Sequence, residues 1–257
     1  MQYFIICITA FLGSGLTLFS GFGLGTILIP VFGLFFPIDI TIALTAIVHF
    51  LNNVFKLSLL GRYADKQVVL RFGIPSIIAA FAGAYLLTML TDLKPITEYS
   101  LISKTFLITP VKLTIGILLV FFALFDVVPS LTNIAFDRKY LSAGGLLSGF
   151  VGGVSGNQGA LRTAFLIRAN LTKEAFIASG ITIACLTDIS RLTVYSKEIF
   201  KHQNEFTYQI IIAATLSAFA GAYLGNKFVK KITIKTLQYF VAVMLMLFGI
   251  LLGFGII

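Results

Sequence analysis

The sequence predicts an all-α polytopic membrane protein that consists of two inverted-topology repeats. The 257 residues are 58% hydrophobic and 11% charged, with a mean hydropathy of +1.00, whereas soluble domains usually contain about 25% charged residues. Apolar runs of about 20 residues, the length that crosses a bilayer as a helix, recur from end to end. The sequence AFAGAYL occurs unchanged at 80–86 and at 218–224, which indicates an internal duplication.

The first repeat, residues 1–133, is expected to open with a broken, glycine-rich helix and to continue with three transmembrane helices. The apolar stretch 3–36 is too long for one span, and it is interrupted by the glycines that follow Ser20 and by Pro30. It therefore suits two half-length helices in a re-entrant hairpin, although a single broken span stays open. The three further segments are 41–61, 72–90 and 110–128. The connection between the last two is expected to be a long polar loop.

The second repeat, residues 134–257, follows the same plan. A broken segment at 141–167 comes first, and the three transmembrane helices are expected at 175–195, 206–228 and 237–257. Apolar segments fill both halves of the chain and leave no room for a separate soluble domain. The two repeats are therefore expected to form one integrated domain.

The distribution of basic residues predicts how the repeats are oriented. A hairpin and three spans make an odd number of crossings in each repeat, so the second repeat would be upside down relative to the first. With both termini outside, basic residues are concentrated in the inner loops, as the positive-inside rule requires. The inner residues are Arg62, Lys66, Arg71, Arg138, Lys139, Arg168, Lys173, Lys227, Lys230, Lys231 and Lys235, and the outer ones are Lys94, Lys104, Lys112, Lys197 and Lys201. A first segment that crossed the membrane once would instead make the repeats parallel.

Polar side chains within the apolar segments mark a candidate site. An ionised side chain costs roughly 3 kcal/mol or more at the centre of a membrane helix, so such residues tend to face a polar interior. In the first repeat they share one helical face at spacings of three and four: His49, Asn52, Asn53 and Lys56. The equivalent face of the second repeat carries Thr187, Asp188 and Arg191. For His49, two interpretations stay open, a hydrogen-bonded helix contact and a proton relay.

The two glycine-rich breaks are expected to complete this site. The N-terminus of a half-length helix presents unpaired N–H groups and a partial positive charge, which suits an anion. The contributing residues would be Ser20, Gly21 and Gly23 in the first repeat and Ser155, Gly156, Asn157, Gln158 and Arg162 in the second. Because cations outnumber the one carboxylate, Asp188, the sequence predicts an anionic ligand. The alternatives are that the glycines serve helix packing, that Lys56 and Arg191 extend to the membrane interface, and that Arg162 anchors a hairpin to the inner surface.

The two glycine-rich openings and the segment 152–160, GGVSGNQGA, resemble the TauE/SafE family of sulfite exporters, also called TSUP transporters. The similarity covers essentially the whole chain through its repeat plan. Phe22 and Leu24 in the first break, and Asn157 and Gln158 in the second, depart from the glycine content expected of that family. The resemblance implies a secondary transporter of the bacterial inner membrane that exports sulfite, a sulfonate or a similar small sulfur-containing anion, and the distribution of basic residues places both termini on the extracytoplasmic side. The anion would bind at a central site between the repeats.

Other functional classes have less support in the sequence. Cys7 and Cys185 lie in apolar segments, and no cluster of cysteine, histidine and carboxylate residues has metal-ligand spacing. We therefore expect no metal, no cofactor and no enzymatic activity. The alternative is a membrane-embedded enzyme of sulfur or lipid metabolism, which would need Cys7, Cys185 or His49 beside a base. A cation transporter would need more intramembrane carboxylates than Asp188.

The expected partners follow from the same observations. The net charge of +9 is explained by the orientation of membrane loops, so nucleic acid is not expected. A small anionic substrate and the lipid bilayer are expected. A homodimer stays open.

Overall fold

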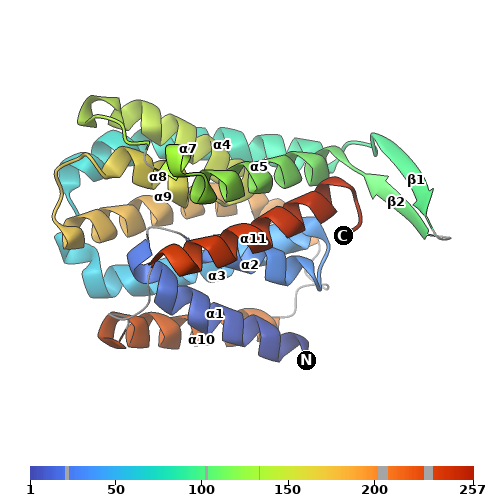
Figure 1. Cartoon of the computed structure of the whole chain (residues 1–257), viewed down its shortest axis with the longest axis horizontal. Helices are drawn as coiled ribbons and strands as arrows, with labels where there is room; N and C mark the ends of the chain where they lie inside the picture. Colours follow the sequence, from blue (N-terminus) through green and yellow to red (C-terminus); the bar gives the residue numbers. More distant parts are fainter. Residues whose placement is uncertain (21–22, 102–103, 133, 202–207, 229–233) are drawn as a thin grey trace.

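The computed structural model describes residues 1–20, 23–101, 104–132, 134–201, 208–228 and 234–257. Most of these residues lie in helices that form one bundle, with both ends of the chain at the same end of the bundle (Figure 1). The first half contains α1 (Gln2–Ser20), α2 (Leu24–Gly33), α3 (Ile38–Leu60), η1 (Gly61–Tyr63), α4 (Lys66–Thr91), α5 (Pro110–Val127) and α6 (Pro129–Thr132). The second half contains η2 (Arg138–Tyr140), α7 (Leu141–Ser155), α8 (Gly159–Leu166), α9 (Lys173–Lys201), α10 (Tyr208–Phe228) and α11 (Ile234–Gly253).

These helices agree with the apolar segments expected from the sequence, and α4 and α9 extend well beyond theirs. α4 begins at Lys66, before the expected apolar segment, because Asp65 caps it. The carboxylate of Asp65 accepts a hydrogen bond from the N–H of Val68 at 2.8 Å. α9 extends beyond both of its expected ends. The expected start of α10, at position 206, lies outside the described residues.

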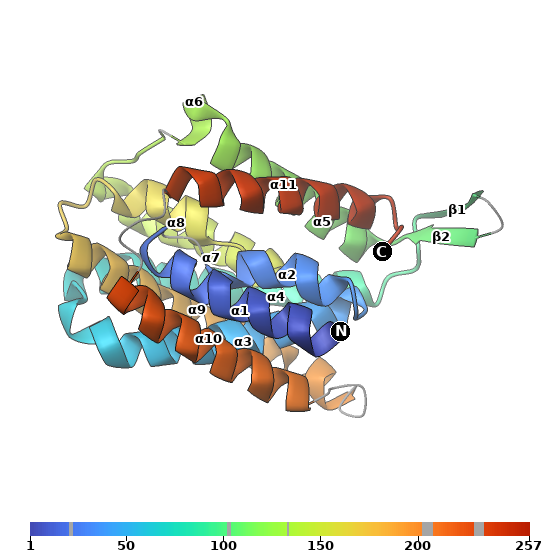
Figure 2. The same ribbon diagram turned by 60° about the horizontal axis from the view of Figure 1, so that its bottom comes forward.

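The connection between α4 and α5 contains a β-hairpin where the sequence predicted a polar loop. β1 (Thr97–Leu101) pairs antiparallel with β2 (Lys104–Ile108), and the hairpin extends beyond the end of the bundle that carries the termini (Figures 1 and 2). The Tyr99 ring stacks on Phe106 across the two strands, and the Tyr99 hydroxyl donates a hydrogen bond to the carbonyl oxygen of Phe254 at 2.8 Å. The bundle itself is all-α, as predicted, and the hairpin is an addition at its periphery.

The distribution of polar and apolar side chains is the reverse of that in a soluble protein. Large apolar side chains point outward, and Phe81, Ile117 and Leu216 are 40%, 60% and 60% exposed. The charged side chains of Asp188 and Arg191, in contrast, are fully buried. Within the described residues, α3, α4, α9 and α10 are long and apolar enough to cross a bilayer. The chain is therefore a multi-pass membrane protein.

Both glycine-rich segments are broken helices, as predicted. α1 ends at Ser20 and α2 begins at Leu24, while α7 ends at Ser155 and α8 begins at Gly159. The two helices of each pair pack against one another. In Figure 1, α2 returns toward the end of the bundle where α1 begins, and α8 returns toward the opposite end, where α7 begins. Each pair is thus a helical hairpin with its tip inside the bundle.

Close contacts between the two halves of the chain hold the bundle together. α4 packs along α7, and α1 packs along α10 (Figures 1 and 2). A Cβ atom added to Gly83 would overlap the carbonyl oxygen of Phe150, and one added to Gly221 would overlap that of Phe11. Gly83 and Gly221 are the central residues of the two AFAGAYL copies. Both copies therefore bring two backbones into contact, which is the packing function typical of small residues in membrane helices.

Candidate functional site

A hydrogen-bonded network of polar side chains lies where α3 packs against α9. Its centre is Asp188 on α9, which is fully buried. Asp188 Oδ2 lies 2.7 Å from Nδ1 of His49 and accepts a hydrogen bond from the side-chain amide of Asn53 at 3.3 Å, both from α3. Asp188 Oδ1 accepts a hydrogen bond from Nε of Arg191 at 3.0 Å, and Arg191 Nη2 lies 2.9 Å from the same oxygen. The carboxylate is thereby paired and hydrogen-bonded, as a buried charge must be.

The tips of the two hairpins lie against this network. Gly156 ends α7 with a φ of 72°, and its N–H donates to the carbonyl oxygen of Gly152. Glycine adopts this left-handed conformation without strain. A Cβ atom at Gly156 would overlap Nη1 of Arg191, and a Cβ atom at Gly23 would lie 2.8 Å from Nε2 of His49. The absence of a side chain at both tips therefore lets the backbone approach the network.

A hydrogen bond joins the two tips. Thr26, in the first turn of α2, donates at 2.9 Å to Oδ1 of Asn157, which lies between α7 and α8. Two other buried atoms here, Nδ2 of Asn157 and Oε1 of Gln158, have no hydrogen-bond partner among the described residues. Buried polar groups are normally paired, so unpaired ones are informative. They indicate that the region between the tips is built for polar contacts beyond those the protein supplies.

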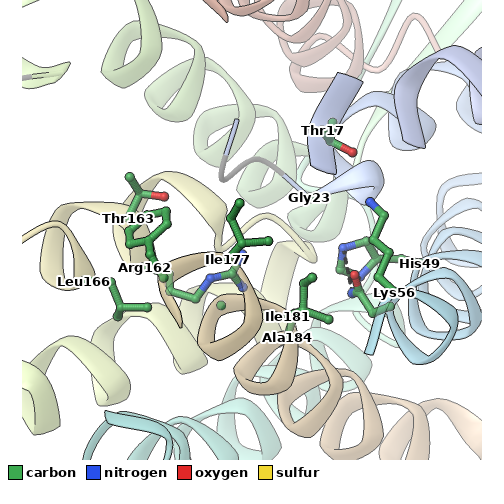
Figure 3. A pocket seen from close by; sticks show the side chains of 13 residues that line it. Thr17, Gly23, His49, Lys56, Arg162, Thr163, Leu166, Ile177, Ile181 and Ala184 are labelled. Carbon is green, nitrogen blue, oxygen red and sulfur yellow. Dashed lines mark hydrogen bonds between the residues drawn. The ribbon is translucent and has the colours of Figure 1, made fainter. Parts of the chain in front are cut away.

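A pocket, drawn in Figure 3, shares His49 and Asn53 with the network and is also lined by the end of α8 and the start of α9. Its volume of about 40 Å³ has room for about three water molecules, so it suits a small ion and not a bulky substrate. Figure 3 shows Arg162 on one side of the pocket and His49 and Lys56 on the other. The lining residues are Thr17, Gly23, His49, Asn53, Lys56, Arg162, Thr163, Leu166, Phe176, Ile177, Gly180, Ile181 and Ala184.

Positive charge predominates around this pocket. The buried charged residues within the described part of the chain are three cations, Lys56, Arg162 and Arg191, and one carboxylate, Asp188. Lys56 is 3% exposed and makes no hydrogen bond or ion pair with any described residue. A buried ammonium group is costly unless a counter-charge approaches it. The pocket is therefore suited to an anion.

The structure places most of the predicted site residues at the pocket or beside it. The predicted residues that line the pocket are Gly23, His49, Asn53, Lys56 and Arg162. The residues that lie behind it, in the network and at the tips of the hairpins, are Gly156, Asn157, Gln158, Asp188 and Arg191. This second group orients the residues of the first group or covers them.

The remaining predicted residues are directed elsewhere. Asn52 accepts a hydrogen bond from the hydroxyl of Ser14 at 2.9 Å, and Thr187 is 2.9 Å from the hydroxyl of Ser76, so each faces a neighbouring helix. The Ser155 hydroxyl donates to a backbone carbonyl oxygen of its own helix and accepts from the N–H of Asn157. Ser20 is the last residue of α1, and Gly21 lies outside the described residues.

Sequence analysis missed several residues that line the pocket. Thr17 precedes the first glycine break, and Thr163 follows Arg162 directly. Their closeness to the breaks is a signal that could have identified these two hydroxyl groups. The apolar wall, to which Ile177 and Ile181 belong, consists of residue types found throughout the chain. No pattern in the sequence distinguishes them.

Groups suited to catalysis are sparse in the described part of the chain. No three histidine, cysteine, aspartate or glutamate side chains of the described residues lie together as a metal site would require. Cys185 is a buried free thiol and Cys7 a half-buried one. Neither cysteine lines the pocket.

Comparison with protein-family models gives a match to the family described as sulfite exporter TauE/SafE, over residues 6–252. The match covers almost the whole chain, including both hairpins and all residues of the pocket. Comparison with curated proteins and with solved structures gives no match.

Proposed function

This chain belongs to the sulfite exporter TauE/SafE family, and we propose that it exports a small sulfur-containing anion, such as sulfite or a sulfonate, across the bacterial inner membrane. The observation that carries the proposal is the small buried pocket in which Lys56 faces Arg162. Family membership supports a membrane transporter of sulfur anions, and the pocket supports a binding place for one. The cargo is thus a compact oxyanion of few atoms.

The bound anion would take its contacts from three directions. Lys56 supplies a positive charge on one side, and Arg162 supplies a planar donor group on the other, which suits the oxygens of a sulfite or sulfonate. Gly23, at the start of α2, lines the pocket without a side chain. The N–H groups of the first turn of α2 therefore add a favourable partial charge. Asp188 and Arg191 act behind this layer, since they hold His49 and Asn53 in place.

The site would lie between two repeats, residues 1–133 and 134–257, of inverted topology. Packing in the bundle is reciprocal in the way that such a relation requires: α4 packs on α7, and its equivalent α10 packs on α1. α3 and α9, the central helices of the two halves, pack on each other, as do α5 and α11. The two hairpins enter from opposite ends of the bundle. These observations support an approximate two-fold axis through the centre of the bundle, close to which the pocket would lie.

The orientation in the membrane would place the pocket on the cytoplasmic side of the network. The end of the bundle nearest the pocket carries the connections with Arg62, Arg138 and Lys173, so the positive-inside rule supports a cytoplasmic location for it. The termini and the β-hairpin would then be extracytoplasmic. With the inside negative, outward movement of an anion gains about 2.3 kcal/mol per charge per 100 mV. Export would thus need no ATP.

The transport cycle would follow from rocking of the two repeats about the pocket. In the present conformation the pocket lies next to the basic end, where it can receive the anion from the cytoplasm. A change in relative position of the repeats would then expose it to the other side. His49 touches both the pocket and Asp188, so it is the residue through which a proton could be coupled.

Efflux from proteoliposomes tests this proposal. Purified protein would be reconstituted into vesicles loaded with labelled sulfite, and efflux would be followed while a potential is imposed with valinomycin and potassium. We expect efflux that depends on the potential and is inhibited by internal sulfonates. In parallel, sulfite, but neither sodium nor potassium, should raise the melting temperature, by an amount that corresponds to about 2.7 kcal/mol at 100 times the dissociation constant. Stabilisation by cations alone would contradict the proposal.

The alternative of a membrane-embedded enzyme leads to a different result. Such an enzyme would depend on Cys7 or Cys185 as the nucleophile. Replacing both by alanine should leave sulfite efflux unchanged, because neither thiol lines the pocket. Loss of efflux in a double variant that retains its melting temperature would favour the enzyme.

A further inference from the structure

Two cavities lie on the opposite side of the network from the pocket, at the end of the bundle that carries the termini. The larger one, of about 460 Å³, is a vestibule between the start of α3, the end of α4, the start of α5 and the end of α11. The smaller one, of about 30 Å³, continues between α3, α4 and α9. Asp39 and Thr91 line both cavities, so the two adjoin each other. Together they lead from this end of the bundle toward its centre.

Tyr195 lies at the inner end of this path. It lines the smaller cavity and is 4% exposed. On α9 it follows Arg191 by four residues, so its side chain lies one turn beyond the Asp188 network on the same helical face. Its hydroxyl donates a hydrogen bond to the carbonyl oxygen of Gly153, near the end of α7. Tyr195 thus connects α9 with α7 close to the tip of the second hairpin.

Tightly packed apolar side chains surround the Tyr195 ring. Tyr195 belongs to a buried cluster that also contains Ile42, Ala46, Leu87 and Val154. Ile42 and Leu87 also line the smaller cavity, whereas Ala46 lies one turn farther into the bundle on α3 and is fully buried. The path therefore ends at this cluster and is separated from the central pocket.

We propose that Tyr195 is the plug that closes the outward pathway in this conformation, and that the two cavities beyond it are the exit route of the anion. This inference rests on the proposed function, since it takes the end with the termini as extracytoplasmic. The charges along the route suit release. One lysine, Lys112, and one aspartate, Asp39, line the vestibule, whereas three cations and one carboxylate are buried around the central pocket. An anion that passes Tyr195 moves from the positively charged pocket to the nearly neutral vestibule. Weak binding in the vestibule then allows the anion to dissociate.

Cysteine accessibility tests the plug without any reference to the cargo. Cys7 and Cys185 are first replaced by alanine, and single cysteines are introduced as Thr88→Cys in the smaller cavity, Ala46→Cys behind the plug and Ile181→Cys in the central pocket. A membrane-impermeant thiol reagent is added to one side of oriented vesicles at a time. We expect labelling of position 88 from the outside alone, of position 181 from the inside alone, and of position 46 from neither side.

Removing the plug should open position 46 to the outside. In the Tyr195→Ala background, outside labelling of Ala46→Cys should rise at least about tenfold, because both the ring and its hydrogen bond are lost. Tyr195→Phe, which loses the hydrogen bond and keeps the ring, should give a rise of about fivefold. Tyr85→Ala is the matched control, because Tyr85 is 62% exposed on α4 and should leave all three positions unchanged.

Three outcomes would overturn the proposal. The first is labelling of position 88 from the inside, and the second is labelling of position 46 from the outside while Tyr195 is in place. The third is outside labelling of position 46 that does not rise in Tyr195→Phe or in a folded Tyr195→Ala variant. Inside labelling of position 181 reports folding in each background. The failure of sulfite efflux, in contrast, would reject the cargo and leave the labelling pattern intact. The two failures are therefore distinguishable.

Discussion

Lys56 and Arg191 occupy equivalent positions in the two repeats expected from the sequence, but their surroundings differ. Lys56 lines the central pocket and has no ion-pair partner among the described residues. Arg191 is paired with Asp188 and covered by the backbone of Gly156. Asn53, the sequence equivalent of Asp188, cannot pair with Lys56 in the same way, because an amide carries no charge. Of the two equivalent cations, one thus lines the pocket and the other is held in the buried network.

This difference teaches that one substitution on the neighbouring helical turn can give two equivalent cations different surroundings and so different roles. A carboxylate three residues before Arg191 neutralises it, whereas an amide three residues before Lys56 gives the lysine no counter-charge. Removing either cation should therefore have a different consequence. Lys56 should matter for flux, and Arg191 should matter mainly for the stability of the fold.

The largest effect is expected for Lys56→Ala. Loss of a charge-assisted contact with the cargo, worth about 3 kcal/mol, should reduce sulfite efflux about 100-fold. The melting temperature should stay the same or rise, because the variant removes a buried ammonium group without a counter-charge among the described residues. Efflux from proteoliposomes and thermal unfolding measure the two effects. Lys56→Arg, which keeps the charge, should retain part of the flux, and wild-type flux in Lys56→Ala would show that this lysine does not contact the anion.

Arg191→Ala should act mainly on stability. The variant leaves the carboxylate of Asp188 buried with fewer partners, which costs about 3 kcal/mol. Thermal unfolding in detergent measures this loss. The double variant Asp188→Asn, Arg191→Gln removes both charges and should recover part of the stability. A single variant as stable as the wild type would contradict the framework role of Arg191.

Gly156→Ala should have a smaller effect of the same kind. An alanine at a φ of 72° costs about 1 kcal/mol, and its Cβ would also displace Nη1 of Arg191. We expect a lower melting temperature and slower efflux. Gly253→Ala is the matched control, because a Cβ atom there meets nothing within 4 Å. Equal behaviour of the two variants would mean that the tip of the hairpin tolerates a side chain.

The smallest effect is expected for Thr26→Val, which keeps the shape of the side chain and removes its hydrogen bond to Asn157. The buried oxygen of Asn157 would lose its donor, at a cost of about 1 kcal/mol. Thr193→Val provides the comparison, since Thr193 is exposed and bonds to its own helix. A loss of stability no greater than that of Thr193→Val would indicate that the two hairpin tips are not coupled through this bond.

The sequence was sufficient to predict the helices, because a helix that crosses the bilayer needs about 20 apolar residues and clustered glycines interrupt such a run. It was also sufficient to select the polar residues of α3 and α9, since spacings of three and four define one helical face. It could not separate neighbours on that face. Asn52 and Asn53 differ by about 100° around the helix. Asn52 faces Ser14 of α1, whereas Asn53 faces Asp188, and only the packing of α1 and α9 around α3 decides this.

Two other features could not be predicted for different physical reasons. The β-hairpin is held by cross-strand pairs and by the bond from Tyr99 to Phe254, which lie 155 residues apart. The apolar wall of the pocket is formed by residues such as Ile177 and Ile181, whose types also fill the lipid-facing surface. Their role depends on which face of the helix points into the bundle. Hydropathy does not distinguish the inner face from the lipid-facing one.

The glycine contacts of α4 with α7 and of α1 with α10 have a consequence for how the molecule can be divided. Each half of the chain supplies the long helix that packs along the opening helix of the other half, so an isolated half keeps only the short second helix of the hairpin as a partner for its own opening helix. Two separately synthesised fragments should be able to reassemble as a complementing pair. A protein half this long could complete the same bundle if two copies entered the bilayer in opposite directions.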